Sequence, residues 1–509
     1  MAVALGAAQL AAALDRPQAS PLVVVGSAFI DLTPAWLKDF AIRTFGSDDK
    51  LVLLLGLAVV LVVVAAFAGV AAPRHPVLAT AAPVVLGLVG CAAALSRPDA
   101  IVVDVVPSLV AALAGVLALH ALRRAWSRVF PAVATGGEPI TGYPGTAFDG
   151  ASGSTGDRRT LLRGGALMIG LAALGGGAGR AVTAVRQAAA DPGPLRLPAP
   201  TDPAPALPRG VDLRLTGLGP FTTPNADFYR VDTVLVVPRV PHEQWRLRVY
   251  GLVERPVELT FADLLALPLV ERDITLTCVS NEVGGPYVGN ARWLGADLAA
   301  LLRRAGVRSG ADQILSRSAD GWTCGTPVQT VLDGRDALLA VGMNGRTLPP
   351  EHGFPARMLV PGLYGYASAT KWVTDIKLTR FADEQAYWTR RGWAERAPIK
   401  TASRIDVPRP FAQVDAGRTM IAGTAWAQHR GVAAVEVRID GGAWRQARLA
   451  ASANLDTWRQ WHLDWLAAPG RHRLEVRATD VTGHTQPDHR APPFPDGATG
   501  WHSVVVTVR

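Results

Sequence analysis

The chain has 509 residues, which is too long for one hydrophobic core, so two or three structural units are expected. Its formal net charge is +9, but the basic residues form no stripe with interleaved aromatic residues, which argues against a nucleic-acid partner. The three cysteines, Cys91, Cys278 and Cys324, cannot build a disulfide framework, and no CxxC or CxxCH motif offers a zinc site or an attached haem.

The hydrophobic excess lies before Arg180 and predicts a membrane anchor in contact with lipid. Three stretches are long and apolar enough to cross the hydrocarbon layer, namely 51–72, 77–95 and 101–122. Asp104 lies one turn into the third stretch, where we expect it near the interface. Residues 1–14 and 21–30 are shorter, and one of them, or both together, forms a first span. The sequence therefore predicts four or five spans.

The positions of the arginines predict the orientation of the anchor. Six of them follow the third span and mark that stretch as cytoplasmic: Arg123, Arg124, Arg128, Arg158, Arg159 and Arg163. The Arg74-His75 link is then also inside, whereas the acidic segments at 47–49 and Asp99 are outside. The last helix returns the chain to the extracytoplasmic side of a bacterial cell membrane, where the catalytic part is expected.

The segment 158–187 has two readings. The pair Arg158-Arg159 precedes the weakly hydrophobic, glycine-rich stretch GGALMIGLAALGGGAG, as in a twin-arginine export signal. An ordinary membrane helix with arginines at its inner end explains the same residues. Residues 1–157 before it form the anchor with its cytoplasmic loop. The Pro/Ala-rich residues 188–212 after it are an expected extended linker.

Residues 213–400 mix strands and helices, which predicts an α+β domain. The patterns predict strands at 245–251 and 273–278, and helices at 259–267 and 295–306. Cys278 ends the second strand and precedes a Gly/Asn-rich loop. A lone cysteine at a strand end usually packs in a core, but a loop of this kind can turn many main-chain N–H groups toward a bulky anion.

The chemistry that these residues suggest is anion and metal binding. Downstream turns present five polar or charged side chains: His352, Arg357, Ser368, Thr370 and Lys371. Arginine, lysine and main-chain amides are what a phosphate needs, and a soft thiolate such as that of Cys278 suits a high-valent metal with sulfur ligands. Roles without a ligand are also open for two of these residues: Arg357 could pair with a surface carboxylate, and His352 could cap a turn.

Several motifs occur in the order and spacing of one family. TLTCVSN, the pair Trp293 and Gly295, MNG, LP, HGFPAR, VPG and KW resemble the sulfite oxidase superfamily, which includes bacterial methionine-sulfoxide-reducing enzymes. The resemblance covers residues 221–400. It implies one pterin bound through two sulfurs to molybdenum, with Cys278 as the protein's metal ligand and catalytic residue.

The resemblance also implies which residues contact the cofactor. Tyr229 and Arg230 match the family's pterin-touching segment, Asn281 follows the cysteine, and His352 with Arg357 matches its HGxPxR pair. The family's phosphate loop corresponds to Ser368, Ala369, Thr370 and Lys371, and Ser318 is a weaker match to a pterin-contacting hydroxyl. Cys324 is expected to be structural.

The chain departs from true sulfite oxidases where they bind a small dianion. Val341 stands in place of their active-site tyrosine, Glu282 follows where their cysteine loop carries arginines, and Ala367-Ser368-Ala369 lacks their loop arginine. Because a dianion needs converging cations, a sulfoxide or N-oxide suits this site better than sulfite. The resemblance implies oxygen-atom transfer at molybdenum, with the cofactor carrying the chemistry.

Residues 401–509 change to short alternating strands, at 435–440, 471–480 and 502–508. This part resembles the immunoglobulin-like β-sandwich that mediates dimers in sulfite oxidases, so a homodimer is plausible. Three tryptophans, Trp458, Trp461 and Trp465, belong either to such an interface or to the core. The predicted fold is thus a multi-domain chain of transmembrane helices, an α+β molybdopterin domain and an immunoglobulin-like domain.

The expected partners are a small-molecule substrate and a separate electron-transfer protein. His75 and His120 are too few for a bis-histidine haem pair across the membrane, so no haem is expected in this chain. One alternative is a membrane-anchored binding or adhesion module that keeps the fold without activity. A transporter has little support, because the spans hold few ionisable groups.

Overall fold

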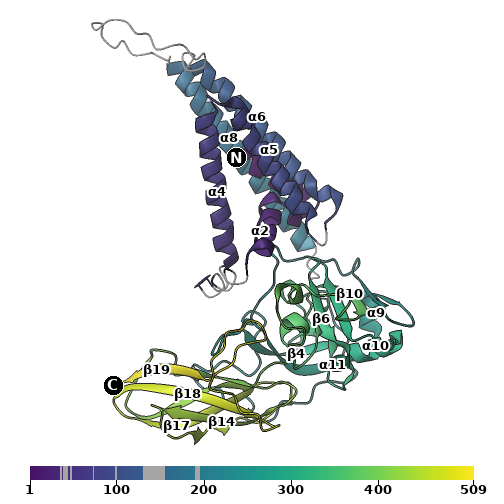
Figure 1. The fold of residues 1–509 in the computed structure, drawn as a ribbon, viewed down its shortest axis with the longest axis vertical. Helices are drawn as coiled ribbons and strands as arrows, with labels where there is room; N and C mark the ends of the chain where they lie inside the picture. Colours follow the sequence, from purple (N-terminus) through teal and green to yellow (C-terminus); the bar gives the residue numbers. More distant parts are fainter. Residues whose placement is uncertain are drawn as a thin grey trace. The chain divides into compact units, whose positions relative to one another are not determined.

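The computed structural model describes residues 1–34, 37, 40, 44–45, 49–72, 74–97, 100–129, 155–189 and 195–509. The chain forms two compact units. The first comprises Met1–Asp191 with Thr233–Val237, and the second comprises Pro192–Asp232 with Pro238–Arg509. Figure 1 shows helices in the first unit and sheets with short helices in the second. The predicted cofactor and C-terminal domains both lie in the second unit.

The described helices of the first unit are α1 (Ala2–Leu14), α2 (Pro21–Leu32), α4 (Asp49–Ala71), α5 (Pro76–Leu95), α6 (Val106–Val129) and α8 (Thr155–Ala189). Within the described ranges, four helical stretches are long and apolar enough to cross a membrane: Lys50–Ala71, Pro76–Leu95, Val102–Ser127 and Gly164–Val185. The segments predicted to form a first span, singly or together, are two shorter helices, α1 and α2, separated by the 3-10 helix Pro17–Ala19. The predicted acidic segments at 47–48 and 99, and the loop 130–154, lie outside the described residues.

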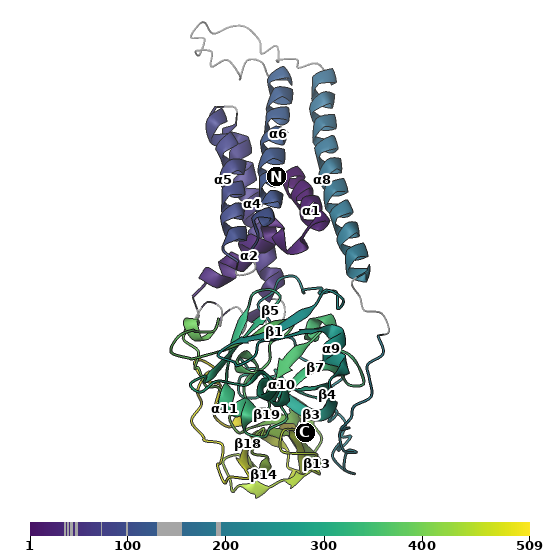
Figure 2. The same ribbon diagram turned by 90° about the vertical axis from the view of Figure 1, so that its right-hand side faces the viewer.

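Close packing of α1 on α8 gives the glycine-rich stretch a structural role (Figure 2). A Cβ atom added at Gly6 would lie 2.7 Å from the carbonyl oxygen of Ala172, and one at Gly175 would lie 2.9 Å from the carbonyl carbon of Gly6. One at Gly179 would lie 3.0 Å from the main chain of Gln9. Small residues at such a spacing let helix backbones approach closely in a membrane. An export signal is therefore not needed to explain these glycines.

Asp104, which we expect near the membrane interface, has an arginine partner within the first unit. Its side chain is fully buried there, and Arg16 Nη1 donates to Oδ2 at 3.0 Å. The main-chain N–H of Ile101 donates to the same oxygen at 3.1 Å. Burial of a carboxylate without a partner would cost several kcal/mol, so the arginine accounts for an acidic residue in this apolar stretch.

Two sheets form the cofactor domain, in the orders β2-β1-β10-β5-β6 and β3-β4-β7-β8, with β9 paired to β7. The strands are β1 (Arg246–Gly251), β2 (Val257–Thr260), β3 (Leu269–Thr277), β4 (Val288–Asp297), β5 (Gln313–Ser318), β6 (Thr323–Pro327), β7 (Leu338–Met343), β8 (Arg346–Thr347), β9 (Arg357–Leu359) and β10 (Val373–Thr379). The helices are α9 (Phe261–Ala266), α10 (Leu298–Ala305) and α11 (Val328–Leu332). One hydrophobic core, which includes Trp245, Trp293 and Ile376, joins the two sheets.

The predicted elements of this domain are present with shifted bounds. Thr260 caps α9, as its Oγ1 accepts from the Asp263 N–H at 3.0 Å. The helix predicted from residue 295 begins at Leu298, because β4 continues to Asp297, whose Oδ1 accepts from the Ala300 N–H at 3.1 Å. The residue that can cap, rather than the glycine before it, thus sets the start of the helix.

The C-terminal part contains a four-stranded sheet, β11-β13-β17-β16, and a five-stranded sheet, β12-β19-β18-β14-β15. The strands are β11 (Ala402–Val407), β12 (Gln413–Val414), β13 (Gly417–Trp426), β14 (Val432–Ile439), β15 (Arg445–Gln446), β16 (Arg448–Leu449), β17 (Arg459–Ala467), β18 (Gly470–Asp480) and β19 (His502–Val508). Both sheets contribute to one core. Trp458, Trp461 and Trp465 are buried within the chain, so they belong to its interior rather than to an exposed interface.

The Pro/Ala-rich segment lies along the second unit from residue 195 onward, and residues 190–194 lie outside the described residues. The Thr201 N–H donates to Leu269 O at 2.7 Å, and the Glu271 N–H donates to Asp202 O at 2.9 Å. The segment thus extends beside the start of β3.

Candidate cofactor-binding site

Cys278 follows the last residue of β3 and is 9% exposed. Its N–H donates to Tyr287 O at 3.0 Å, and its carbonyl accepts from the Asn281 N–H at 3.1 Å, which closes a tight turn after the strand. Burial raises the pKa of the thiol, while hydrogen bonds from the Ser280 main chain and hydroxyl, and the charge of Lys371, lower it. The thiolate that a metal would bind is therefore already supported by donors.

Asn281 holds the loop after the cysteine in shape. Its Oδ1 accepts from the Tyr287 N–H at 2.8 Å, and a Cβ atom at Gly285 would lie 2.6 Å from the same oxygen. The loop thus returns tightly to β4, which begins at Val288. The sequence predicted Asn281 as a cofactor contact, and the structure places it, buried, in the turn directly after Cys278.

Arg357, at the start of β9, is 6% exposed and has no carboxylate partner among the described residues. Nη1 donates to His352 O at 3.1 Å, and the guanidinium lies 5.1 Å from the Trp293 ring centroid. Nε is buried and finds no hydrogen-bond partner among the described residues. Burial lowers the pKa to about 10, so the group stays charged at neutral pH. Pairing with a surface carboxylate is therefore wrong for this arginine.

His352 lies against the same group of residues. Its Nε2 is 3.0 Å from Asn225 O, and its ring meets Phe228 edge-on at 5.5 Å. Burial, together with the charge of Arg357, lowers the pKa to about 4. The ring is therefore neutral at physiological pH, and the Nε2–H donates to the carbonyl of Asn225.

Tyr229 stacks on Phe228 at 5.2 Å and meets Tyr287 edge-on at 6.3 Å. Burial raises the pKa of its hydroxyl, the charge of Cys278 raises it further, and the charge of Arg357 lowers it. Tyr229 is thus close enough to both residues to feel their charges. The structure therefore brings together three residues that are far apart in the sequence.

Lys371 is almost fully buried beside Asp232, a residue that the sequence analysis did not single out. Lys371 Nζ donates to Asp232 Oδ2 at 2.7 Å and to Glu351 O at 3.1 Å. Arg230 Nε donates to the same carboxylate oxygen at 2.8 Å. Burial lowers the pKa of Lys371 to about 8, although Asp232 opposes this. The only sequence signal for Asp232 is its place two residues after Arg230.

The hydroxyl groups of the predicted phosphate loop point into the protein. Ser368 Oγ donates to the carbonyls of Leu363 and Tyr364, both at 3.0 Å, and Thr370 Oγ1 lies 2.7 Å from Ser316 Oγ. Both side chains are fully buried. The N–H groups of Ser368 and Ala369 also donate to Gly365 O, at 3.4 and 2.9 Å. Ligand contacts from this loop would therefore come from its other main-chain N–H groups and from Lys371.

Three further positions that the sequence singled out are buried. Ser318 ends β5 and is buried, and its neighbour Ala319 donates from its N–H to Trp372 O at 2.9 Å, next to Lys371. Val341 is fully buried in β7 and presents no hydroxyl to the site. Cys324 is fully buried, with Sγ 3.7 Å from Thr326 Oγ1, as expected of a structural cysteine.

The site fits an anionic, sulfur-donating cofactor. It combines one thiol, the buried charges of Arg357 and Lys371, and an Nε without a partner among the described residues. Within those residues, no three His, Cys, Asp or Glu side chains gather to hold a metal ion. Cys278 would supply the protein's thiolate to a metal that such a cofactor carries.

Residues 234–388 match the family described as the oxidoreductase molybdopterin binding domain. Chicken (Gallus gallus) sulfite oxidase is 30% identical over 323 residues, covering 53% of this chain and 69% of that protein. The uncharacterised oxidoreductase YuiH of Bacillus subtilis is 34% identical over 177 residues, covering 34% of this chain and 86% of that protein. The chain spans 62% of the length of rat (Rattus norvegicus) sulfite oxidase, at 29% identity over 57% of its own length.

A similar solved structure is that of the sulfane dehydrogenase SoxCD from Paracoccus pantotrophus, with a TM-score of 0.50 and 25% identity. That likeness covers 57% of this chain and 84% of the other. The sequence prediction of the family and of its cofactor is confirmed. This chain belongs to the sulfite-oxidase-like family of molybdopterin oxidoreductases, whose cofactor is molybdenum bound to molybdopterin.

Proposed function

We propose that the chain transfers an oxygen atom to or from a small extracytoplasmic substrate, and that it favours S- or N-oxide reduction over sulfite oxidation. The observation that carries this proposal is the buried guanidinium of Arg357. It has an Nε without a partner among the described residues and lies close enough to Tyr229 to shift its pKa. A buried cation that is left unsatisfied is costly unless a ligand completes it. The alternative of an inactive binding module gives no reason to keep it.

In this proposal the Cys278 thiolate is the protein's metal ligand, and Ser280 stabilises it by donating to the sulfur. The cofactor, when bound, supplies two-electron oxygen-atom transfer. The proposed cofactor contacts are those predicted from the sequence: Tyr229, Arg230, Asn281, Ser318, His352, Arg357, Ser368, Ala369, Thr370 and Lys371. Lys371 and Arg357 neutralise the phosphate, and the neutral ring of His352 can donate or accept without adding charge.

The preference for a weakly charged substrate rests on the few cations near the thiol. The positive charge that lowers the thiol pKa is that of Lys371, which is already paired with Asp232. Glu282 lies in the cysteine loop, and Val341 is buried. The curated relatives include the sulfite oxidases and a nitrate reductase of Volvox carteri, 27% identical over 54% of this chain. The named activities in the family thus include both oxidation and reduction.

We further propose that the four long apolar helices anchor the chain in a bacterial membrane, with the site on the extracytoplasmic side. Arg158 and Arg159 lie within α8. They serve either as a twin-arginine signal or as arginines at the inner end of a membrane helix. A separate protein then supplies the electrons. The two C-terminal sheets with their shared core support an immunoglobulin-like domain. We propose that the chain forms a homodimer through this domain.

The test is a substrate comparison on the full chain, purified in detergent from a host that makes the cofactor. Methionine sulfoxide, dimethyl sulfoxide and trimethylamine N-oxide are offered with reduced viologen dye, and sulfite is offered with ferricyanide. We expect turnover of at least one oxide that exceeds sulfite turnover. Oxidation of sulfite without reduction of any oxide would contradict the substrate assignment, and the absence of all turnover from molybdenum-loaded protein would contradict the activity.

A further inference from the structure

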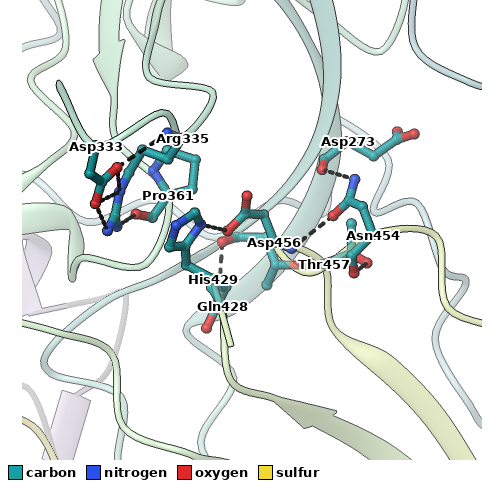
Figure 3. Close-up of polar contacts among 10 residues, drawn as sticks. Asp273, Asp333, Arg335, Pro361, Gln428, His429, Asn454, Asp456 and Thr457 are labelled. Atoms are coloured by element: carbon teal, nitrogen blue, oxygen red, sulfur yellow. Dashed lines mark hydrogen bonds and ion pairs between the residues drawn. The ribbon is translucent and has the colours of Figure 1, made fainter. Parts of the chain in front are cut away.

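Strand β3, which ends just before Cys278, is an edge strand of its sheet, and the C-terminal part covers its free edge. The Thr275 N–H donates to Asp456 O at 2.9 Å, and the Trp458 N–H donates to Thr275 Oγ1 at 2.7 Å. Asn454 Nδ2 donates to Asp273 O at 3.0 Å (Figure 3). These bonds satisfy main-chain groups that an edge strand otherwise leaves open.

Gln428 extends this contact to the residue immediately before the cysteine. Its side chain is fully buried, and Nε2 donates to Thr275 O at 3.1 Å and to Thr277 Oγ1 at 2.9 Å. Gln428 lies just after the end of β13 (Gly417–Trp426), so it belongs to the C-terminal part rather than to the cofactor domain. A buried amide that makes two such bonds fixes the end of β3 against movement.

The loop after the cysteine is held from the same C-terminal part. Arg404 Nη1 donates to Gly285 O at 2.7 Å, and its Nε donates to Asp406 Oδ1 at 2.6 Å. His502 packs so closely on Gly284 that an added Cβ atom would overlap its ring, and the φ of Gly284 is +81°. The Ile405 N–H donates to His502 Nδ1 at 3.0 Å, which fixes that ring.

We propose that the C-terminal part positions the metal-binding cysteine, with Gln428 acting ahead of Cys278 and Arg404 with His502 acting behind it. This inference rests on the proposed role of Cys278 as the metal ligand. The thiol sits between a strand end and an irregular loop, a place where local opening is otherwise easy. Holding both sides directs the sulfur and limits its movement, as a metal ligand requires. The three side chains are positioning residues.

The test measures how fast Cys278 reacts with N-ethylmaleimide in the cofactor-free full chain. The protein is made in a host that cannot synthesise the cofactor, and peptide mass spectrometry follows Cys278 and the core residue Cys324 separately. The variants are Gln428→Ala and Arg404→Ala. The matched control is Arg477→Ala, which removes a C-terminal arginine whose Nε donates to Glu436 at 2.8 Å on the neighbouring strand.

In both variants we expect N-ethylmaleimide to alkylate Cys278 at least about tenfold faster than in wild type, because each variant loses buried hydrogen bonds beside the cysteine. The rate at Cys324, and both rates in the control variant, should stay unchanged. A folded Arg404→Ala or Gln428→Ala protein in which Cys278 keeps the wild-type rate would overturn the proposal. Because no cofactor takes part, this failure is distinct from a failure of the proposed activity.

A further variant decides the matter if an alanine variant unfolds, in which case Cys324 would react faster as well. Gly284→Ala forces the loop away from His502, so Cys278 should react faster while Cys324 does not. A folded Gly284→Ala protein in which Cys278 keeps the wild-type rate would contradict the role of this contact.

Discussion

Acidification from pH 7.5 to 5.0 should destabilise the cofactor-free chain through two buried histidines. His352 and His502 are 5% and 9% exposed, and burial, with nearby arginine charges, lowers the pKa of each from 6.5 to about 4. Between pH 6.5 and about 4, each of these histidines is protonated in the unfolded chain but stays neutral in the folded chain. The free energy of unfolding therefore falls as the pH falls through this window.

The size of this effect follows from the two pKa values. One unit is worth about 1.36 kcal/mol, so each histidine costs about 3.4 kcal/mol in full and about 2 kcal/mol by pH 5.0, or about 4 kcal/mol for both. At pH 5.0 most carboxylates are still ionised in both states, while His472 and Asp406, whose pKa values are raised by a hydrogen bond to Asp440 and by burial respectively, act in the opposite direction. Urea unfolding followed by tryptophan emission at pH 7.5 and 5.0 measures the difference.

Two variants separate this explanation from a general acid effect. His502→Asn keeps an acceptor for the Ile405 N–H and should remove about half of the pH-dependent loss. His472 is the matched control, because its hydrogen bond to Asp440 raises its pKa. The stabilising contribution of His472 is present below pH 6.5 and is lost at higher pH. Acidification therefore gains this contribution in wild type, and His472→Asn, which lacks it, should lose more stability on acidification. A wild-type difference below about 1 kcal/mol, or no change in His502→Asn, would refute the reasoning.

Three further outcomes are expected. Arg357→Met should lower the molybdenum content at least tenfold. Because it removes a buried charge, the cofactor-free chain should be equally stable in urea or about 1–4 kcal/mol more stable, whereas a large loss of stability would show a structural role. Gly175→Leu should lower the thermal stability of the detergent-purified chain, whereas Gly176→Leu, which has open space around it, should not; equal effects would contradict the α1–α8 packing. Replacing both Arg158 and Arg159 by lysine should leave protease accessibility of the site from outside unchanged if α8 is an ordinary helix, and should abolish it if the pair is an export signal.

The sequence predicted local features well because their signals are local. Alternating residues and caps located β3, α9 and α10 to within a few residues, and the motif around Cys278 led to the right family. The pairing of Lys371 with Asp232 spans 139 residues, and that of Arg404 with Gly285 spans 119. No periodicity or spacing carries such information, so these contacts required the structure.

Residue type alone does not show which partners a polar side chain has. Ser368 and Thr370 match the family's phosphate loop, and the structure adds that their hydroxyls bond to protein groups. Asp104 lies in an apolar stretch, and its partner Arg16 is distant in the sequence. The sequence also left open whether Trp458, Trp461 and Trp465 belong to the core or to an interface, and their burial decides for the core.

The most direct test of the central claim is elemental analysis of the full chain, purified from a molybdenum-replete host that makes the cofactor. Cys278→Ser is compared with Cys324→Ser, which changes a fully buried cysteine that the proposed site does not use. We predict about one molybdenum per chain in wild type and in Cys324→Ser, and its loss in Cys278→Ser. A wild-type protein without molybdenum, or a Cys278→Ser protein that keeps it fully, would contradict the assignment of this cysteine as the metal ligand.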